Sequence, residues 1–238
     1  MNASLARAGE LLRAGKPVLI YDADGREEEV DLFFAAEHAT PDAVRALRSE
    51  AGGLVFLAVD PRIGSALELP FLQDLYAEAG EAHPVLRRLI PNDIKYDKRS
   101  SFSLTLNHRQ TFTGITDNDR SLTITEFAKL GKRALAGHTS DLMDAFGKSF
   151  RAPGHVHLCV GADGLLHTRK GHTEIAVALA RLSGVTPVIA GAEMLGEGKA
   201  RGKAGALDWA NRHNTVLLEG KAIEDAWMKL EVQVPASR

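Results

Sequence analysis

The irregular order of apolar runs and helical patterns most constrains what this chain can fold into. Residues 18–21, 30–36 and 54–59 are apolar enough for buried strands, whereas residues 4–14 carry apolar side chains at helical spacing. Strands and helices do not alternate regularly, which favours an α+β fold over a doubly wound parallel sheet. Since no repeat, low-complexity tract or linker stands out, we expect a single domain over residues 1–238.

Turn and cap signals add three local predictions. Thr40 followed by Pro41 is typical of a helix start. Residues 113–120 are predicted to form a polar loop that leads into a helix from about residue 122 to residue 135. The Gly161-Ala-Asp-Gly164 turn, flanked by apolar segments, predicts a hairpin-like pair.

Chemistry-bearing residues gather where a predicted helix begins after Gly171. His172 lies in its first turn, where backbone N–H groups are free and the helix dipole favours anions. The same dipole is expected to disfavour a protonated imidazole. Arg169 and Thr173 add a guanidinium and a hydroxyl, so the segment is similar to a phosphate-binding site. The alternative, that this segment is only a helix cap, stays open.

A second cluster, GREEEVD at residues 25–31, lies between two apolar runs as a hairpin loop would. An acidic run taken alone is more typical of a solvated loop. If the two clusters meet in space, carboxylates, an imidazole and guanidiniums surround one anionic ligand. Sequence spacing does not decide whether they meet.

Composition excludes several classes of protein. A formal net charge of −2 without a basic stripe gives no reason to expect nucleic acid as a partner. No apolar run approaches membrane-spanning length. The one cysteine, Cys159, lies in an apolar run and is predicted to be a buried small hydrophobe, which suits a reducing cytoplasm. We therefore expect a cytoplasmic protein without a membrane partner.

Six motifs in order across nearly the whole chain carry a resemblance to a known family. They are Arg26-Glu27 with Glu29 and Asp31, SSFSLTLNHR from Ser100, TFTGITDNDR from Thr111, RAPGH from Arg151, RKGHTE from Arg169, and the segment 187–193. Together they resemble the 3,4-dihydroxy-2-butanone 4-phosphate synthases of riboflavin biosynthesis, most closely their archaeal branch.

The resemblance implies a mixed sheet with helices on both sides and a homodimer. It implies conversion of D-ribulose 5-phosphate to L-3,4-dihydroxy-2-butanone 4-phosphate and formate, with Mg²⁺. Imidazole is a less usual Mg²⁺ ligand than carboxylate, so Mn²⁺ is an alternative. Enolising a ketose phosphate needs a base near the carbon acid and an electrophile on the carbonyl, which suits these residue types.

The resemblance also implies residue roles. Glu27 and His172 are the implied metal ligands, and His155 and Glu193 the implied proton-transfer residues. The residues implied to bind the substrate are Arg26, Glu27, Asp31, Arg169, Gly171, His172, Thr173 and Glu193.

The chain departs from the family pattern in three respects. Phe56 stands where many relatives have cysteine, and Val30 where small or hydroxyl residues are common. A cyclohydrolase domain with a cysteine zinc site is not expected, so the prediction is a monofunctional protein. Two alternatives stay open: another metal-dependent phosphosugar aldolase or isomerase, and a non-catalytic phosphosugar-binding paralogue.

Overall fold

One mixed sheet organises the part of the chain that the structure describes. The computed structural model describes residues 3–91, 93–94, 96–97, 99–138 and 140–233. The strands are β1 (Val18–Tyr21), β2 (Val30–Ala35), β3 (Phe56–Val59), β4 (Phe102–His108), β5 (Phe150–Val160), β6 (Val188–Glu193) and β7 (Leu217–Glu219). Their order in the sheet is β4-β5-β3-β6-β2-β1-β7. The β1–β7 and β3–β5 pairs are parallel and the other neighbours antiparallel.

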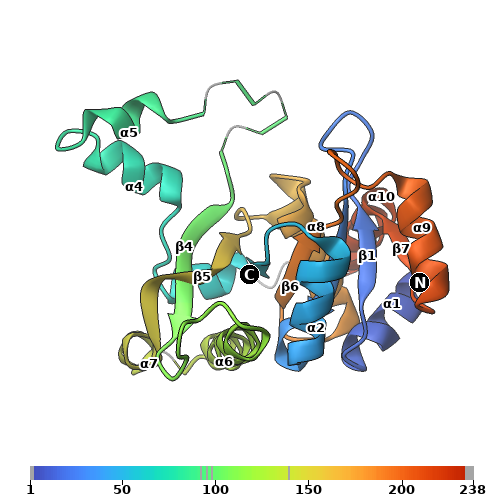
Figure 1. Cartoon of the computed structure of the whole chain (residues 1–238), viewed down its shortest axis with the longest axis horizontal. Helices are drawn as coiled ribbons and strands as arrows, with labels where there is room; N and C mark the ends of the chain where they lie inside the picture. The colour runs from blue at the N-terminus through green and yellow to red at the C-terminus, as the bar shows by residue number, and fades with distance from the viewer. Residues whose placement is uncertain (1–2, 92, 95, 98, 139, 234–238) are drawn as a thin grey trace.

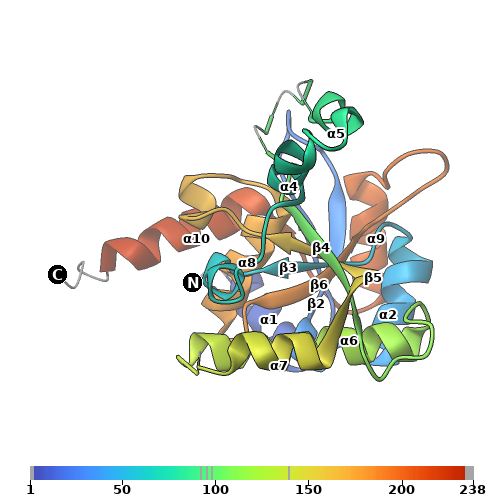
Figure 2. The ribbon, with the colours of Figure 1, turned by 90° about the vertical axis from the view of Figure 1, so that its left-hand side faces the viewer.

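Helices cover both faces of this sheet, which confirms the α+β prediction (Figures 1 and 2). They are α1 (Ala3–Arg13), η1 (Ala36–His38), α2 (Pro41–Ala46), η2 (Leu47–Ala51), α3 (Pro61–Ala66), α4 (Leu72–Ala79), α5 (Pro84–Arg88), α6 (Asp117–Leu135), α7 (Leu142–Ser149), η3 (Leu165–His167), α8 (His172–Ser183), α9 (Lys203–Arg212) and α10 (Gly220–Gln233). On one face α1, α8 and α10 share an apolar core with Phe33. On the other, α2, α6 and α9 share a core with Leu57. None of the described helices is long and apolar enough to span a bilayer.

The first strands form as their sequence predicts. All residues of β1, β2 and β3 are buried, because each strand has a neighbour on both sides and helices on both faces. Thr40 caps α2 as expected: its hydroxyl accepts a hydrogen bond from the backbone N–H of Ala43 at 3.3 Å.

Two local predictions are wrong. Helix α6 begins at Asp117, about five residues early, because Thr116 caps it and accepts a hydrogen bond from the Asp119 N–H. Acidic side chains in its first turn complement the dipole, so a polar stretch is helical. The hairpin around residues 161–164 does not form. Leu165–His167 is a 3₁₀ turn, while β5 extends back to Phe150 and pairs with β4.

Helices α4 and α5 project away from the sheet, and neither has a buried residue (Figure 1). The described part of the connection from α5 to β4, residues 89–91, 93–94, 96–97 and 99–101, lies toward the β1–β2 connection in Figure 1. This connection therefore reaches the end of the sheet at which the predicted functional segments gather.

Candidate active site

A cavity of about 420 Å³ lies where β1 turns into β2 and α8 begins. It brings together residues predicted from the acidic loop, the start of α8 and the end of β6. Those among its lining are Arg26, Glu27, Asp31, Arg169, His172, Thr173 and Glu193. The two clusters that sequence spacing left unconnected therefore meet in space.

The sheet register explains how distant segments converge. Strands β2 and β6 are antiparallel neighbours, and Asp31 stands opposite Glu193. Residues opposite each other in a sheet point to the same face. That face is the one on which α8 packs, so the first turn of α8 brings His172 to Asp31.

His172 lies between two carboxylates. Its Nδ1 lies 3.0 Å from Oε2 of Glu27, and its Nε2 lies 3.7 Å from Oδ1 of Asp31. Burial opposes the charged imidazole, but the Asp31 and Glu27 carboxylates outweigh burial and raise the pKa of His172 to about 9. Without a metal ion the two adjacent carboxylates favour the protonated imidazole more strongly than the helix dipole disfavours it, so a metal ion that binds His172 has to displace that proton.

The carboxylates respond to their surroundings in opposite directions. Burial alone raises the pKa of Glu27, but His172, Arg26 and Arg169 outweigh it and lower the pKa to about 2. For Asp31, which is 1% exposed, burial dominates. Together with Glu193, Glu27 and Glu29 it overcomes His172 and raises the pKa of Asp31 to about 7. One carboxyl is thus held ionised while its neighbour titrates near neutrality.

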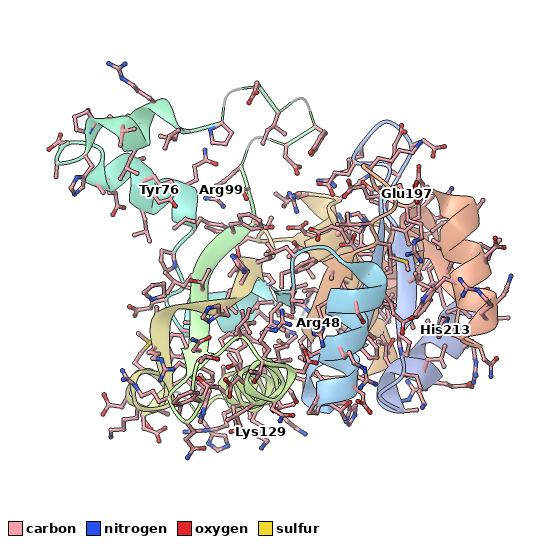
Figure 3. The ribbon with its side chains drawn as sticks, in the orientation of Figure 1. Arg48, Tyr76, Arg99, Lys129, Glu197 and His213 are labelled. Carbon is pink, nitrogen blue, oxygen red and sulfur yellow. The ribbon has the colours of Figure 1, made fainter. Side chains whose placement is uncertain are left out.

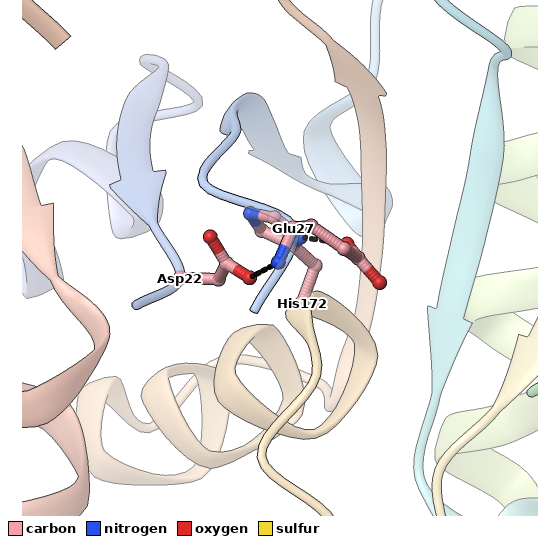
Figure 4. A group of neighbouring side chains, drawn as sticks. All are labelled: Asp22, Glu27 and His172. Atoms are coloured by element: carbon pink, nitrogen blue, oxygen red, sulfur yellow. Dashed lines mark hydrogen bonds and ion pairs between the residues drawn. The ribbon is translucent and has the colours of Figure 1, made fainter. Parts of the chain in front are cut away.

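The donor set fits a divalent cation. Among the described residues, Asp22, Glu27 and His172 offer ligand atoms that all lie within 4.8 Å of one another (Figure 4). Oδ1 of Asp31 and Nε2 of His172 are buried without a hydrogen-bond partner. A metal ion beside them would satisfy the Asp31 oxygen, and it would satisfy the His172 nitrogen once the imidazole has lost its proton. The carboxylate oxygens suit a hard divalent cation, and the imidazole is the less usual ligand for such an ion.

Asp22 has a further role that sequence reasoning missed. Its two carboxylate oxygens accept hydrogen bonds from the backbone N–H groups of Glu27 and Glu29, at 3.0 and 3.1 Å. Asp22 therefore shapes the acidic loop as well as lying near Glu27. In the sequence it stood in an ordinary Asp-Ala-Asp-Gly turn, which gave no sign of this role.

Arg169 anchors the cationic side of the cavity. Its Nη1 donates to Oε2 of buried Glu174 at 2.6 Å. Gly171, the N-cap of α8, does not line the cavity. A Cβ at this position would collide with the Arg169 guanidinium, so glycine lets the arginine pack against the start of α8. Thr173 lies in the first turn of that helix, where its hydroxyl is 3.1 Å from that of Ser101.

Glu193 is held at the opposite wall. Its Oε2 accepts a hydrogen bond from the Leu54 N–H at 2.8 Å, and its backbone oxygen accepts one from Gly53 at 3.0 Å. A Cβ on Gly53 would strike the Glu193 side chain, which explains glycine at this position. Phe56 also lines the cavity and packs edge-on against Phe33.

His155 is the one predicted catalytic residue that the cavity does not include. It is exposed on β5, where its N–H donates to Oδ1 of Asn107 at 2.9 Å. His157, two residues along β5, is close enough to both Glu193 and His155 to be affected by their charges. Burial lowers the pKa of His157, the Glu193 charge raises it, and the His155 charge lowers it further. His155 therefore stands beside the cavity and not inside it.

Other lining residues carried no predicted role. They are Glu29, Ile94, Tyr96, Asp97, Ser100, Ser101, Phe102 and Cys159. Ser100 and Ser101 fall in a motif that carried the family resemblance, so that motif could have suggested them. Asp97 falls in a polar segment without periodicity, and no sequence signal pointed to it. Cys159 is buried as predicted, and burial raises the pKa of its thiol to about 12.

Comparison with known proteins decides the family. A family model described as 3,4-dihydroxy-2-butanone 4-phosphate synthase matches residues 6–226. The chain belongs to this family. A synthase of that name from Methanosarcina acetivorans is 44% identical over 231 residues, which cover 95% of this chain and 92% of the relative. The Archaeoglobus fulgidus synthase is 43% identical over 226 residues, 93% of each chain. The archaeal relatives agree with the predicted branch, and the chain is an enzyme of this synthase family.

Solved structures share the fold. A 3,4-dihydroxy-2-butanone 4-phosphate synthase in complex with two magnesium ions aligns with a TM-score of 0.70 at 24% identity, over 95% of this chain and 97% of that one. The Candida albicans synthase aligns with a TM-score of 0.68 at 23% identity, over 95% and 96%. At this identity the two structures support the fold of the chain.

Proposed function

We propose that the chain converts D-ribulose 5-phosphate to L-3,4-dihydroxy-2-butanone 4-phosphate and formate. The convergence of seven residues with family-implied roles on one cavity carries the proposal. The cavity combines what a phosphorylated ketose requires: guanidiniums for the phosphate, carboxylates and an imidazole for a cation, and titratable groups for proton transfer.

The phosphate is proposed to bind on the side of Arg26 and Arg169. Both guanidiniums line the cavity, and Arg169 packs against the first turn of α8. This 12-residue helix has no side-chain cap, so no capping side chain occupies its first backbone N–H groups, and Thr173 adds a hydroxyl in the same first turn. Donors and helix dipole together favour an anion here.

Glu27 and His172 are proposed to hold Mg²⁺, with Mn²⁺ as an alternative. The unpaired Oδ1 of Asp31 beside them supports a cation at this position. When bound, the ion would polarise the sugar carbonyl and stabilise negative charge that develops on its oxygen. Glu27 is suited to this role because its carboxylate stays ionised at every physiological pH.

Proton transfer is proposed to involve Glu193 and His155, with Asp31 close by. Glu193 of β6 stands opposite Asp31 of the neighbouring strand β2. The pKa of Asp31, raised to about 7, suits proton exchange near neutral pH. Enolisation and the later rearrangement require several proton transfers, so more than one such group is expected. A Cβ on Gly191 would collide with the Phe33 ring, so glycine here makes room for that aromatic side chain.

We further propose a homodimer in which His155 serves the cavity of a second copy. His155 is exposed and outside the cavity of its own chain. Asn107, which holds it, also donates to the backbone oxygen of Thr113 at 3.4 Å. In that loop Phe112 is 92% exposed and Ile115 is 49% exposed. Apolar side chains of this size beside a catalytic histidine support burial by another subunit. A cytoplasmic location and a single domain over residues 1–238 complete the proposal.

Formate release tests the proposal. Purified chain with D-ribulose 5-phosphate and MgCl₂ is expected to release one formate per sugar consumed, and excess chelator is expected to stop it. A phosphosugar isomerase or aldolase would consume the sugar without formate. A binding paralogue would bind the sugar and leave it unchanged. Either result would refute the proposed reaction.

A further inference from the structure

Asp97 occupies the position between the two arginines of the cavity. Its Oδ2 accepts hydrogen bonds from Nη2 of Arg26 at 2.5 Å and from Nη2 of Arg169 at 2.6 Å. One carboxylate oxygen thus receives two guanidinium donors from different segments. An oxygen of a phosphate would receive the same donors in the same place.

These ion pairs are shielded from solvent. The side chains of Arg26, Asp97 and Arg169 are 9%, 10% and 16% exposed. Charge-assisted hydrogen bonds at such burial are stronger than surface pairs. Glu174 accepts a hydrogen bond from the other terminal nitrogen of Arg169, Nη1. The Glu174 side chain is fully buried and also accepts from the Ala162 N–H, so Glu174 is a fixed part of the fold.

Asp97 comes from the connection between α5 and β4. Arg99, which Figure 3 labels beside α4, ties the far end of this connection to that helix. Its guanidinium donates to Asp74 at 3.0 Å and lies 3.7 Å from the centre of the Phe71 ring. Tyr96 lies on the other side, with its ring 5.1 Å from the Arg26 guanidinium. If Asp97 withdrew, Nη2 of Arg26 and Nη2 of Arg169 would each lose this acceptor, while Nη1 of Arg26 would keep Glu27 and Nη1 of Arg169 would keep Glu174.

We propose that Asp97 is an internal competitor for the phosphate of the substrate. This inference rests on the proposed function, because it assumes that Arg26 and Arg169 bind the phosphate. A phosphate and the Asp97 carboxylate are both anions and would repel each other if they contacted the same guanidinium groups. A phosphate therefore binds both guanidiniums only when the Asp97 carboxylate leaves them. Substrate and product of the proposed reaction both carry the phosphate. Competition by Asp97 therefore weakens the binding of both and helps the product leave.

Binding of inorganic phosphate to the full chain, measured by calorimetry without any sugar, tests the proposal. If Asp97 leaves the arginines free about one tenth of the time, Asp97→Asn is expected to bind phosphate about tenfold more tightly than the wild type. Asp97→Ala should behave alike, and circular dichroism checks that both fold. Asp93→Asn is the matched control, since Asp93 is an exposed aspartate of the same connection that does not line the cavity.

Equal or weaker phosphate binding by the Asp97 variants would overturn the inference, since Asp97 would then be neutral or would only position the arginines. Arg169→Ala should lose phosphate binding in either background, which assigns the measured site. These readouts do not depend on formate. A chain that releases formate while Asp97→Asn leaves phosphate affinity unchanged loses only the competitor role. Tighter binding without formate release leaves that role standing and removes the synthase reaction.

Discussion

Glu27 has cations on two sides, and each stabilises its carboxylate: His172 at 3.0 Å and Arg26 at 3.1 Å. Glu27→Gln keeps the size of the side chain and removes its charge. We expect Mg²⁺ or Mn²⁺ affinity, measured by calorimetry, to fall tenfold or more, with little change in the free energy of unfolding. Glu28→Gln is the control, because exposed Glu28 can still accept from the Gly25 N–H as an amide. Unchanged metal affinity in Glu27→Gln would remove Glu27 from the metal site.

Arg169 is proposed to bind the phosphate, the part of the substrate that does not react. Arg169→Ala should therefore mainly raise KM for D-ribulose 5-phosphate, with a smaller loss in kcat. Lys170→Ala removes the same charge from the next residue, which is exposed and pairs with Glu224, and it should leave KM unchanged. Steady-state kinetics distinguish the two. If wild type used unphosphorylated ribulose as well as the phosphate, Arg169 and Thr173 would not bind a phosphate.

Glu193 is the predicted proton-transfer residue that lies inside the cavity. Glu193→Gln preserves an acceptor for the Leu54 N–H but cannot take a proton. Turnover is expected to fall by roughly a hundredfold or more, the usual scale for a general acid–base group. Calorimetry should show that substrate and metal affinity change far less. A defect that more substrate or more Mg²⁺ restores would contradict the catalytic role.

At the scale of elements, Asp60 joins the end of β3 to α8. Arg181 of α8 donates to both of its oxygens, at 2.6 and 2.7 Å, and Arg62 donates to it from α3. Burial raises the pKa of Asp60, but the hydrogen bonds from Arg181 and Arg62 outweigh it and lower that pKa. A lowered folded-state pKa stabilises the fold above the unfolded value of about 3.9, and this contribution is lost as pH falls through the folded value.

Asp60→Asn is therefore expected to lower the free energy of unfolding at pH 7 by about 3 kcal/mol, because two arginines lose a buried partner. The variant should also lose less stability than the wild type on acidification below pH 4. Urea unfolding at several pH values measures both effects. Asp144→Asn, an aspartate that is 80% exposed, should change stability by less than about 0.5 kcal/mol. Parallel pH curves for wild type and Asp60→Asn would contradict this account.

The sequence predicts an element correctly where burial requires a recognisable pattern of apolar residues. Strand β1 is apolar on both faces, and β2 is apolar except at Asp31, so their positions follow from these apolar runs. The pattern fails where several partners are available to one segment. The apolar run 156–160 is compatible with two pairings, a local hairpin through residues 161–164 or a sheet with distant β4. In the structure it pairs with β4, which provides the longer ladder. The segment that holds Asp97 is polar and irregular, so its approach to Arg26 and Arg169 is fixed by tertiary contacts alone.

The assembled site is a property of the whole molecule. The acidic loop and the start of α8 were recognisable as separate clusters, but their spacing did not show that they meet. The family resemblance connected them, and the β2–β6 register supplies the physical reason for the pairing of Asp31 with Glu193. The resemblance alone could not show that His155 lies outside the cavity of its own chain, because that depends on the position of β5 in the sheet.

The homodimer prediction is tested by mixing two damaged chains. His155→Ser and Glu193→Gln are each expected to reduce turnover about a hundredfold. If His155 serves a second copy, random mixing gives half mixed dimers with one intact site of two, so activity should recover to about a quarter of the wild-type value. Sedimentation checks that the chains associate. Absence of recovery in confirmed mixed dimers, or a fully active monomer, would refute shared sites.

The position of β6 between β3 and β2 has a consequence for how the protein is made. While the ribosome is still translating the middle of the chain, β2 and β3 have no strand to pair with across the gap that β6 will fill. Each then exposes an apolar edge, which is prone to pairing with other chains. The nascent polypeptide also lacks Glu193 opposite Asp31 until residues 188–193 emerge. Late arrival of this strand predicts that chaperone shortage would lower the yield of active protein more than its rate of synthesis.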